Sequence, residues 1–269
     1  LSLFLANILA IPLSTSEVTV GSIVGAGIVY QSLYVAQFAW IFMFWILTPL
    51  VAFAVAVLAG KFLKWPAVKN WVRSKKAKPV LAVLVVIMGI FEAFSAGMNN
   101  VANAVGPLVG ADILTTQSGI FWGGLFVAIG ALLLGRGVLE TNGKKITELR
   151  IEEGCIISGT GAGLVMAASI FGIPVPLVQI TTSSIIGIGF AKQGMSVLKK
   201  DIVIRLLAVW IVSPVLSMVL CFTLIQLLIE HNIYPIVVMA GLLISVFGVK
   251  YLMKKKPDES REVMLSKQN

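Results

Sequence analysis

The sequence predicts an all-α integral membrane protein built as an inverted repeat, with broken helices and two re-entrant helical hairpins. Three observations predict this fold class: an apolar composition, long apolar runs, and an apolar motif that occurs twice in opposite orientations. The chain is 58% hydrophobic and only 12% charged, whereas about a quarter of the residues in soluble domains are charged. A protein that crosses the membrane several times is therefore expected.

Five apolar runs reach, or nearly reach, the length of a bilayer-spanning helix. They cover residues 36–60, 80–97, 119–135, 202–229 and 234–252. A further apolar stretch, 154–191, is divided by the sequence Gly172-Ile-Pro-Val-Pro176. Gly106 and Pro107 predict another disruption of the backbone, because proline lacks the N–H that a helix interior needs.

The positive charge indicates which connections face the cytoplasm. The net charge is +9, and all 21 Lys and Arg fall in four clusters, at 61–78, 136–150, 192–205 and 250–267. Short basic connections face the cytoplasm, so an even number of crossings separates each cluster from the next. The stretch 154–191 must then begin and end on one side, as a re-entrant hairpin does. This topology explains the basic runs better than a nucleic-acid partner, and it places a multi-pass protein in the cell membrane with its basic loops and C-terminus cytoplasmic.

Two parts of the chain are related by a repeat. Residues 11–27 align without gaps on 173–189, and Trp45-Ile-Leu-Thr-Pro49 aligns on Trp210-Ile-Val-Ser-Pro214. Two matches in the same order, at offsets of 162 and 165, indicate a duplicated unit. The run 36–60 ends in the cytoplasm and 202–229 begins there, so the two units cross in opposite directions. Many secondary transporters follow this plan, with a binding site near the bilayer midplane between the halves.

The repeat also divides the chain. Residues 1–60 are expected to be the remainder of the first unit, 61–79 a basic cytoplasmic linker, 80–253 the second unit and 254–269 a cytoplasmic tail. Hairpins at 1–30 and 154–191 are expected to enter from opposite faces and meet. The counterpart of 91–111 would precede residue 1, so we also expect a fragment that lacks on the order of 70–100 residues.

Uncharged hydrogen-bond donors gather in the segments where half-helix N-termini are expected to meet. Such N-termini carry partial positive charge and suit anions, so these side chains predict an anion site. The same residue types also serve as helix-packing residues in membranes, and that alternative stays open for each one. The candidate substrate-binding residues are Ser14, Thr15, Ser16, Thr19, Asn99, Asn100, Asn103, Thr181, Thr182, Ser183 and Ser184.

Two acidic residues fall in the apolar interior, where no Lys or Arg accompanies them. An ionised carboxylate inside a membrane costs several kcal/mol or takes up a proton, so such residues are functional candidates. We expect Glu17 to be the first candidate for a proton carrier and Glu92 the second, with Gln179 at the position that aligns with Glu17.

Enzymatic chemistry is not indicated. The chain has no HExxH, no GxSxG and no His–Asp pairing, and its two cysteines form no CxxC. No metal and no cofactor are therefore expected. A structural membrane subunit leaves the repeat and the buried acids unexplained, and a channel would be distinguished from a transporter by flux that is saturable and coupled to a gradient.

The segment Gly97-Met-Asn-Asn-Val-Ala-Asn-Ala104 resembles the G-x-N-D-V-A-N-A signature of the inorganic phosphate transporter (PiT) family. The proline-led Ser/Thr segments and the paired W-x-x-[ST]-P motifs resemble that family too, over nearly all of residues 1–250. Within the family, the chain looks most like the bacterial sulfate permease branch. The resemblance implies inverted repeats, two hairpins that meet at the substrate, a transport domain that moves against a scaffold, and a homodimer.

Departures from the family pattern bear on the substrate and the coupling ion. Asn100 stands where the family has Asp, and Glu17 and Gln179 stand where it has His. The family aspartates help to hold sodium, so the neutral Asn100 disfavours sodium coupling. Sulfate only accepts hydrogen bonds, so amide and hydroxyl donors suit it, whereas hydrogen phosphate also needs an acceptor. We expect import of sulfate with protons; the alternative is a symporter of phosphate or another oxyanion such as molybdate or thiosulfate, including a sodium-coupled one.

Overall fold

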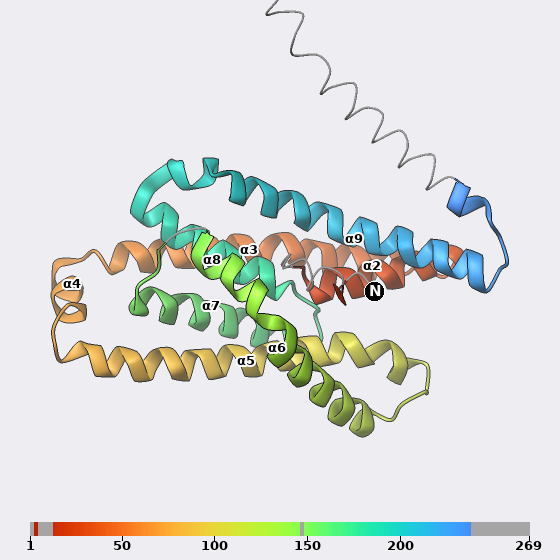
Figure 1. Cartoon of the computed structure of the whole chain (residues 1–269), viewed down its shortest axis with the longest axis horizontal. Coiled ribbons are helices and arrows are strands. Elements are labelled where there is room, and N and C mark those ends of the chain that lie inside the picture. The colour runs from red at the N-terminus through yellow and green to blue at the C-terminus, as the bar shows by residue number, and fades with distance from the viewer. Residues whose placement is uncertain (1–2, 5–12, 146–147, 238–269) are drawn as a thin grey trace, which may run out of the picture.

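A computed structural model describes residues 3–4, 13–145 and 148–237, and the elements found there are helices (Figure 1). The fold class predicted from the sequence, an all-α integral membrane protein, is confirmed. The helices are α2 (Thr15–Val29), α3 (Val35–Phe62), α4 (Pro66–Val72), α5 (Ala77–Gly110), α6 (Thr116–Lys145), α7 (Ile151–Ile170), α8 (Leu177–Gln193), the 3-10 helix η1 (Gly194–Lys199) and α9 (Asp201–Leu228).

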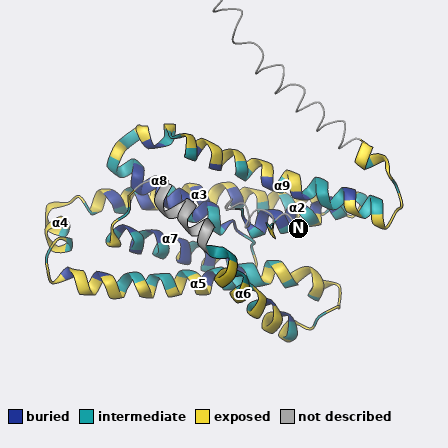
Figure 2. Ribbon diagram, viewed as in Figure 1, coloured by how far each residue is buried: buried dark blue, intermediate teal, exposed yellow. Residues whose placement is uncertain are grey.

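Five of these helices are long and apolar enough to cross a membrane: α3, α5, α6 over Thr116–Gly135, α7 and α9. Four of them contain the predicted runs 36–60, 80–97, 119–135 and, to within a residue, 202–229, and α7 is the first arm of the predicted hairpin 154–191. Exposed residues follow α5 and α9 along the two edges of the view in Figure 2, and many of them are large and apolar. The fifth predicted run and the tail 254–269 extend beyond residue 237, outside the described residues.

Proline does not interrupt the helix where the sequence predicted it. Helix α5 continues through Gly106 and Pro107 and ends at Gly110. Pro107 lies in the last turn of the helix, so it removes only one main-chain hydrogen bond, close to an end where the carbonyls lack helical partners in any case. Pro49 and Pro214 likewise lie inside continuous helices, α3 and α9.

Helices α7 and α8 form a hairpin. Helix α7 begins and helix α8 ends at the same end of the bundle, where Lys192 of α8 donates to Glu153 of α7. From there α7 runs parallel to α5, with Gly154 beside Val85 and the carbonyl of Ala162 accepting from Ser95. The turn between the arms lies at the level of Asn99. Helix α5 continues for eleven residues beyond Asn99, a rise of about 16 Å, so the turn stops well short of the end of α5.

Helices α2 and α8 begin against each other and run to opposite ends of α3. Their first turns meet where Gln179 of α8 donates to Glu17 of α2, and Ser16 donates to the carbonyl of Val175 just before α8. At its other end, α8 reaches the last turn of α3, where a Cβ built at Gly60 would lie 2.8 Å from that of Ala191. Lys64, just after α3, donates to the carbonyl of Ala191. The end of α2 lies instead near Leu33, just before α3 begins.

The two short helices each pack against a long helix, and the positions in one contact are those that the sequence alignment pairs with the positions in the other. Helix α2 packs on α9, and a Cβ built at Gly25 would lie only 2.4 Å from the carbonyl oxygen of Met218. Helix α8 packs on α3 in the same way, where a Cβ at Gly187 would lie 2.6 Å from the carbonyl oxygen of Phe53. Gly25 and Gly187 are 162 residues apart and Phe53 and Met218 are 165 apart, the same two offsets that relate the sequence motifs. The two contacts are therefore equivalent under the repeat.

Candidate functional site

The turn of the α7–α8 hairpin is held by side chains from three other helices. We call residues 173–176, which contain two prolines without N–H groups, the hairpin tip. The carbonyl of Pro174 accepts from Trp45 Nε1 at 3.0 Å, and that of Val175 accepts from Ser16 Oγ at 2.8 Å and Asn99 Nδ2 at 3.0 Å. Non-helical backbone is tolerated at membrane depth only when its polar groups find partners in this way.

Asparagine amides from α5 converge on the start of α2. Asn99 is buried, donates to Ser16 Oγ at 3.1 Å and accepts at 3.4 Å from the N–H of Val175. Asn103, one helical turn further, donates to the same Ser16 hydroxyl at 2.7 Å. Asn100, the next residue of the helix, projects in a different direction from Asn99 and is half-buried. Two of the three asparagines predicted for the site therefore meet one hydroxyl of the first repeat unit.

The buried carboxylate of Glu17 lies where α2 meets α8 and α9. It is 1% exposed and accepts hydrogen bonds from Gln179 Nε2 and, at 2.7 Å, from Ser213 Oγ. Among the residues that the structure describes, it forms no ion pair. Glu17 and Gln179 align in the repeat, so the two halves contact each other at equivalent positions. The carboxylate is held entirely by neutral donors.

A second acidic residue lies along α5. Glu92 is half-buried and accepts from Thr181 Oγ1 of α8 at 3.1 Å, next to Gly161 of α7. The hydroxyl of the neighbouring Thr182 is buried and has no hydrogen-bond partner within the described ranges. Glu92 is thus partnered separately from Glu17.

The remaining predicted residues differ in their surroundings. Ser14 caps α2 by accepting from the N–H of Glu17 at 3.4 Å, and Ser184 donates to the carbonyl of Ile180 in its own helix. Ser183 is buried, and Thr15 and Thr19 are half-buried.

Sequence reasoning missed two contributors, Trp45 and Ser213. Both belong to the paired W-x-x-[ST]-P motifs, which indicate the repeat and the family but do not by themselves predict a polar site. The available signal was that a tryptophan and a hydroxyl residue recur with the same spacing in both copies of the motif. An indole N–H and a hydroxyl that recur at repeat-related positions are candidates for holding polar groups in an apolar interior.

Chemically, this arrangement offers neutral donors to an acceptor. Ser16 Oγ and Asn99 Nδ2 both point at one oxygen, the carbonyl of Val175, and the N-termini of α2 and α8 add partial positive charge. In the part of the chain that is described, no group of three His, Cys, Asp or Glu is placed to hold a metal ion.

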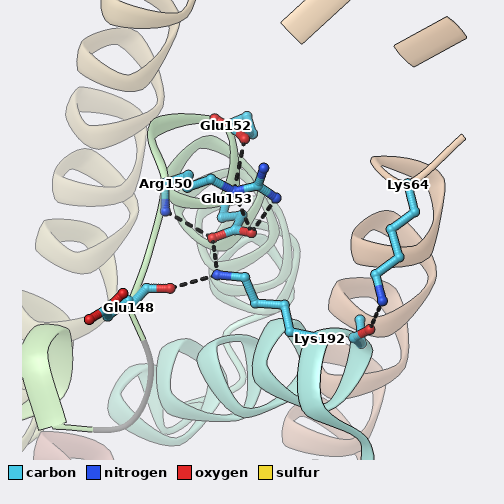
Figure 3. A network of polar contacts seen from close by, with 7 residues as sticks. Lys64, Glu148, Arg150, Glu152, Glu153 and Lys192 are labelled. Atoms are coloured by element: carbon cyan, nitrogen blue, oxygen red, sulfur yellow. Dashed lines mark hydrogen bonds and ion pairs between the residues drawn. The ribbon is translucent and has the colours of Figure 1, made fainter. Parts of the chain in front are cut away.

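A different polar network closes the base of the α7–α8 hairpin (Figure 3). Glu153 is 2% exposed and lies between Arg150, 2.9 Å from its Nη2, and Lys192, 2.8 Å from its Nζ. The hydrogen bond to Glu153 raises the pKa of the Arg150 guanidinium above its ordinary value. Lys192 also donates to the carbonyl of Glu148 at 2.6 Å, and Lys64 donates to that of Ala191. This network ties both arms of the hairpin to each other and to the segment that follows α3.

The comparisons with known proteins agree on one family. A model of the phosphate transporter family matches residues 1–75 and 67–221. The chain is 51% identical over 263 residues to the sulfate permease CysP of Bacillus subtilis, covering 98% of this chain and 74% of that protein. It is 27% identical over 300 residues to a putative phosphate permease of Thermococcus kodakarensis, covering 82% and 74%. A putative phosphate permease of Pyrococcus furiosus is 35% identical over 148 residues, covering 51% and 36%. No solved structure matches the chain. These relatives are named as permeases rather than enzymes.

Proposed function

Because this chain belongs to the phosphate transporter family, we propose that it is a secondary active transporter that imports sulfate across the cell membrane together with protons. The observation that carries the proposal is the convergence of neutral donors, Ser16, Asn99 and Asn103, where α2 meets the hairpin tip. Such donors match an oxyanion that only accepts hydrogen bonds. The sulfate permease from Bacillus subtilis, at 51% identity, supports the same substrate.

The proposed binding step is an exchange of acceptors. Ser16 Oγ and Asn99 Nδ2 donate to the carbonyl of Val175 at 2.8 and 3.0 Å, and an oxygen of sulfate is an acceptor of the same kind. We propose that a sulfate oxygen takes these donors, and that the hairpin tip is thereby released from α2 and α5. The other predicted donors would form the walls around the anion: Ser14, Thr15, Thr19, Asn100, Thr181, Thr182, Ser183 and Ser184.

Proton coupling is assigned to Glu17. A carboxylate next to Ser16 would repel a dianion, whereas a protonated carboxyl would not, so sulfate and a proton favour each other at this site. Gln179 and Ser213 would hold the carboxyl in either state, because amides and hydroxyls can both donate and accept. Glu92 is the second candidate. The neutral Asn100 argues against sodium.

The proposed architecture follows the repeat. Residues 1–60 and 80–253 would form two inverted units joined by the basic cytoplasmic linker 61–79, with the α7–α8 hairpin re-entering from the cytoplasmic side. The exchanged packing of α2 on α9 and of α8 on α3 supports this interpretation, since the two contacts are repeat-equivalent. A homodimer is part of the proposal.

Uptake of labelled sulfate into proteoliposomes tests the proposal. We expect accumulation to rise with an inward proton gradient and to be insensitive to sodium. Uptake that sodium alone drives equally well would contradict proton coupling.

A phosphate transporter is the second candidate, because two of the relatives are named putative phosphate permeases. Competition with phosphate, molybdate and thiosulfate separates the two. Sulfate uptake that phosphate suppresses at lower concentration than unlabelled sulfate would favour the second candidate.

A further inference from the structure

Segment 61–78 concentrates positive charge that forms no ion pair within the described residues. It runs from the last turn of α3 through α4 to the start of α5 and contains seven basic residues and no acid. Lys64 donates to the carbonyl of Ala191. The other six are exposed, and none forms an ion pair within the described part of the chain. These six are Lys61, Lys69, Arg73, Lys75, Lys76 and Lys78.

Two basic residues elsewhere at this end of the molecule, Arg150 and Lys192, are paired. Arg150 pairs with Glu152 and Glu153, and Lys192 pairs with Glu153 (Figure 3). Six like charges in one short segment repel one another unless an external anion lies among them. These six cations therefore have no ion-pair partner within the described residues and are free to take an external anionic partner.

Exposed aromatic residues show where that partner lies. Trp65 directly precedes α4 and Trp71 lies in its last turn; they are 64% and 52% exposed. Phe62, in edge contact with Trp65, is 56% exposed. Tryptophan prefers the boundary between hydrocarbon and water. Helix α4 joins the ends of α3 and α5 at one end of the molecule (Figure 1). Since both of these helices are long enough to span the bilayer, α4 lies at the level of the headgroups.

We propose that segment 61–78 is a binding surface for anionic phospholipid headgroups of the bilayer in which the protein sits. The cations bind the phosphates, and Trp65 and Trp71 anchor the short helix among the glycerol backbones. A bilayer source fits better than a soluble anion, because aromatic and basic side chains are interleaved along one segment at the membrane surface.

The surface is physically connected to the α7–α8 hairpin. Lys64 belongs to the same segment, and its ammonium group holds the carbonyl of Ala191 at the end of α8. The next residue of α8, Lys192, holds Glu153 at the start of α7. A headgroup that competes for Lys64 would therefore loosen the base of the hairpin, so the lipid composition is expected to affect its movement.

Tryptophan quenching by brominated lipids tests the surface without depending on transport. The full chain is reconstituted in phosphatidylcholine with a fixed fraction of either brominated phosphatidylglycerol or brominated phosphatidylcholine. We expect stronger quenching by the anionic lipid, and we expect this difference to disappear in the Trp65→Phe/Trp71→Phe variant. It should also decrease at high salt in the unmodified protein, which needs no mutation. Equal quenching by the two brominated lipids would overturn the proposal.

Two variants that each remove two positive charges test whether the lipid preference depends on segment 61–78. Lys75→Gln/Lys76→Gln should weaken the preference for the anionic lipid roughly fivefold per charge removed. Lys199→Gln/Arg205→Gln removes the same charge around the start of α9 and should leave the preference unchanged. An equal loss in both variants would show that the anionic lipids respond to the overall positive charge of the protein and do not bind specifically at segment 61–78. Loss of the preference on addition of inorganic phosphate at constant ionic strength would identify a soluble anion as the partner and overturn the lipid assignment.

Discussion

At the level of single residues, Glu17 gives the sharpest prediction. Lower pH protonates its carboxyl and removes a negative charge beside the proposed anion site, so sulfate should bind more tightly. Coupling of this kind is typically worth about 5- to 150-fold in affinity. In Glu17→Gln, which keeps neutral contacts to Gln179 and Ser213 possible, the pH dependence should be lost. Sulfate affinity measured between pH 5 and pH 8 checks this.

The control for this variant is Glu230→Gln. Glu230 is exposed at the far end of α9, so its substitution should preserve both affinity and pH dependence. Proton-driven uptake that survives Glu17→Gln undiminished would remove Glu17 from the coupling step and leave Glu92 as the candidate.

The two repeat-related tryptophans provide a matched pair. Trp45→Phe leaves the carbonyl of Pro174 without its indole donor, and an unsatisfied buried polar group costs about 1–3 kcal/mol. The Nε1 of Trp210 has no hydrogen-bond partner among the described residues, so Trp210→Phe removes similar volume without breaking such a bond. Unfolding in mixed detergent micelles should show a lower midpoint for Trp45→Phe. Equal losses would mean that the indole hydrogen bond contributes nothing measurable.

Sequence reasoning identified part of the central site. The contact of Glu17 with Gln179 joins two positions that the repeat alignment had already paired. Ser213 and Trp45 were missed because a hydroxyl or an indole in an apolar run is interpreted as a packing residue as long as its neighbours are unknown. Spacing along one chain cannot show which carbonyls of a distant turn need donors.

At the level of secondary-structure elements, the hairpin tip should respond to substrate in an unusual direction. If sulfate takes the donors that hold Val175, the bond between the Val175 N–H and Asn99 Oδ1 should weaken. Hydrogen exchange in a peptide covering 171–176 should therefore become faster on addition of sulfate, although binding usually protects amides. Chloride at the same ionic strength should have no effect.

The same experiment distinguishes failure of the proposed acceptor exchange from failure of the proposed substrate. Slower exchange at the tip with sulfate bound would contradict the exchange of acceptors while preserving a sulfate site. Absence of any change in exchange or in thermal stability with sulfate would contradict the proposed substrate itself.

Close contact between helices predicts which glycines tolerate a methyl group. A Cβ at Gly25 would lie 2.4 Å from a carbonyl oxygen of α9, so Gly25→Ala should destabilise the protein by about 1–3 kcal/mol. At Gly89 nothing lies within 4 Å of an added Cβ, and Gly89→Ala should be neutral or slightly stabilising. Unfolding midpoints of the two variants check the difference, and similar values would show that α2 and α9 adjust freely.

Hydropathy was sufficient to predict the long helices, because a run of apolar residues has few other options in a membrane. The proline rule was misleading at Pro107, since the effect of a proline depends on how far the helix continues. The packing of α2 on α9 was beyond sequence reasoning, because the repeat indicates that two units are equivalent but not which helix of one contacts which helix of the other.

At the level of the whole molecule, the proposed topology predicts which positions react from each side. In a Cys155→Ser/Cys221→Ser background, an impermeant thiol reagent should label Lys69→Cys and Ser196→Cys only from the cytoplasm. Asn232→Cys should react only from outside. Phe171→Cys, beside the hairpin tip, should react from neither side in a closed re-entrant hairpin. Labelling of Phe171→Cys from outside would mean that α7 crosses the membrane completely.

The interlocked packing of the two repeat units also has a consequence for biogenesis. Helix α2 leaves the ribosome early, but the surface against which Gly25 packs belongs to α9 and begins 172 residues after α2 ends. At about 5–20 residues per second, this corresponds to roughly 10–30 seconds of translation. During that interval a nascent α2 must wait in the translocation machinery or in lipid without its native neighbour, so the assembly of this protein is completed only when its last described helix arrives.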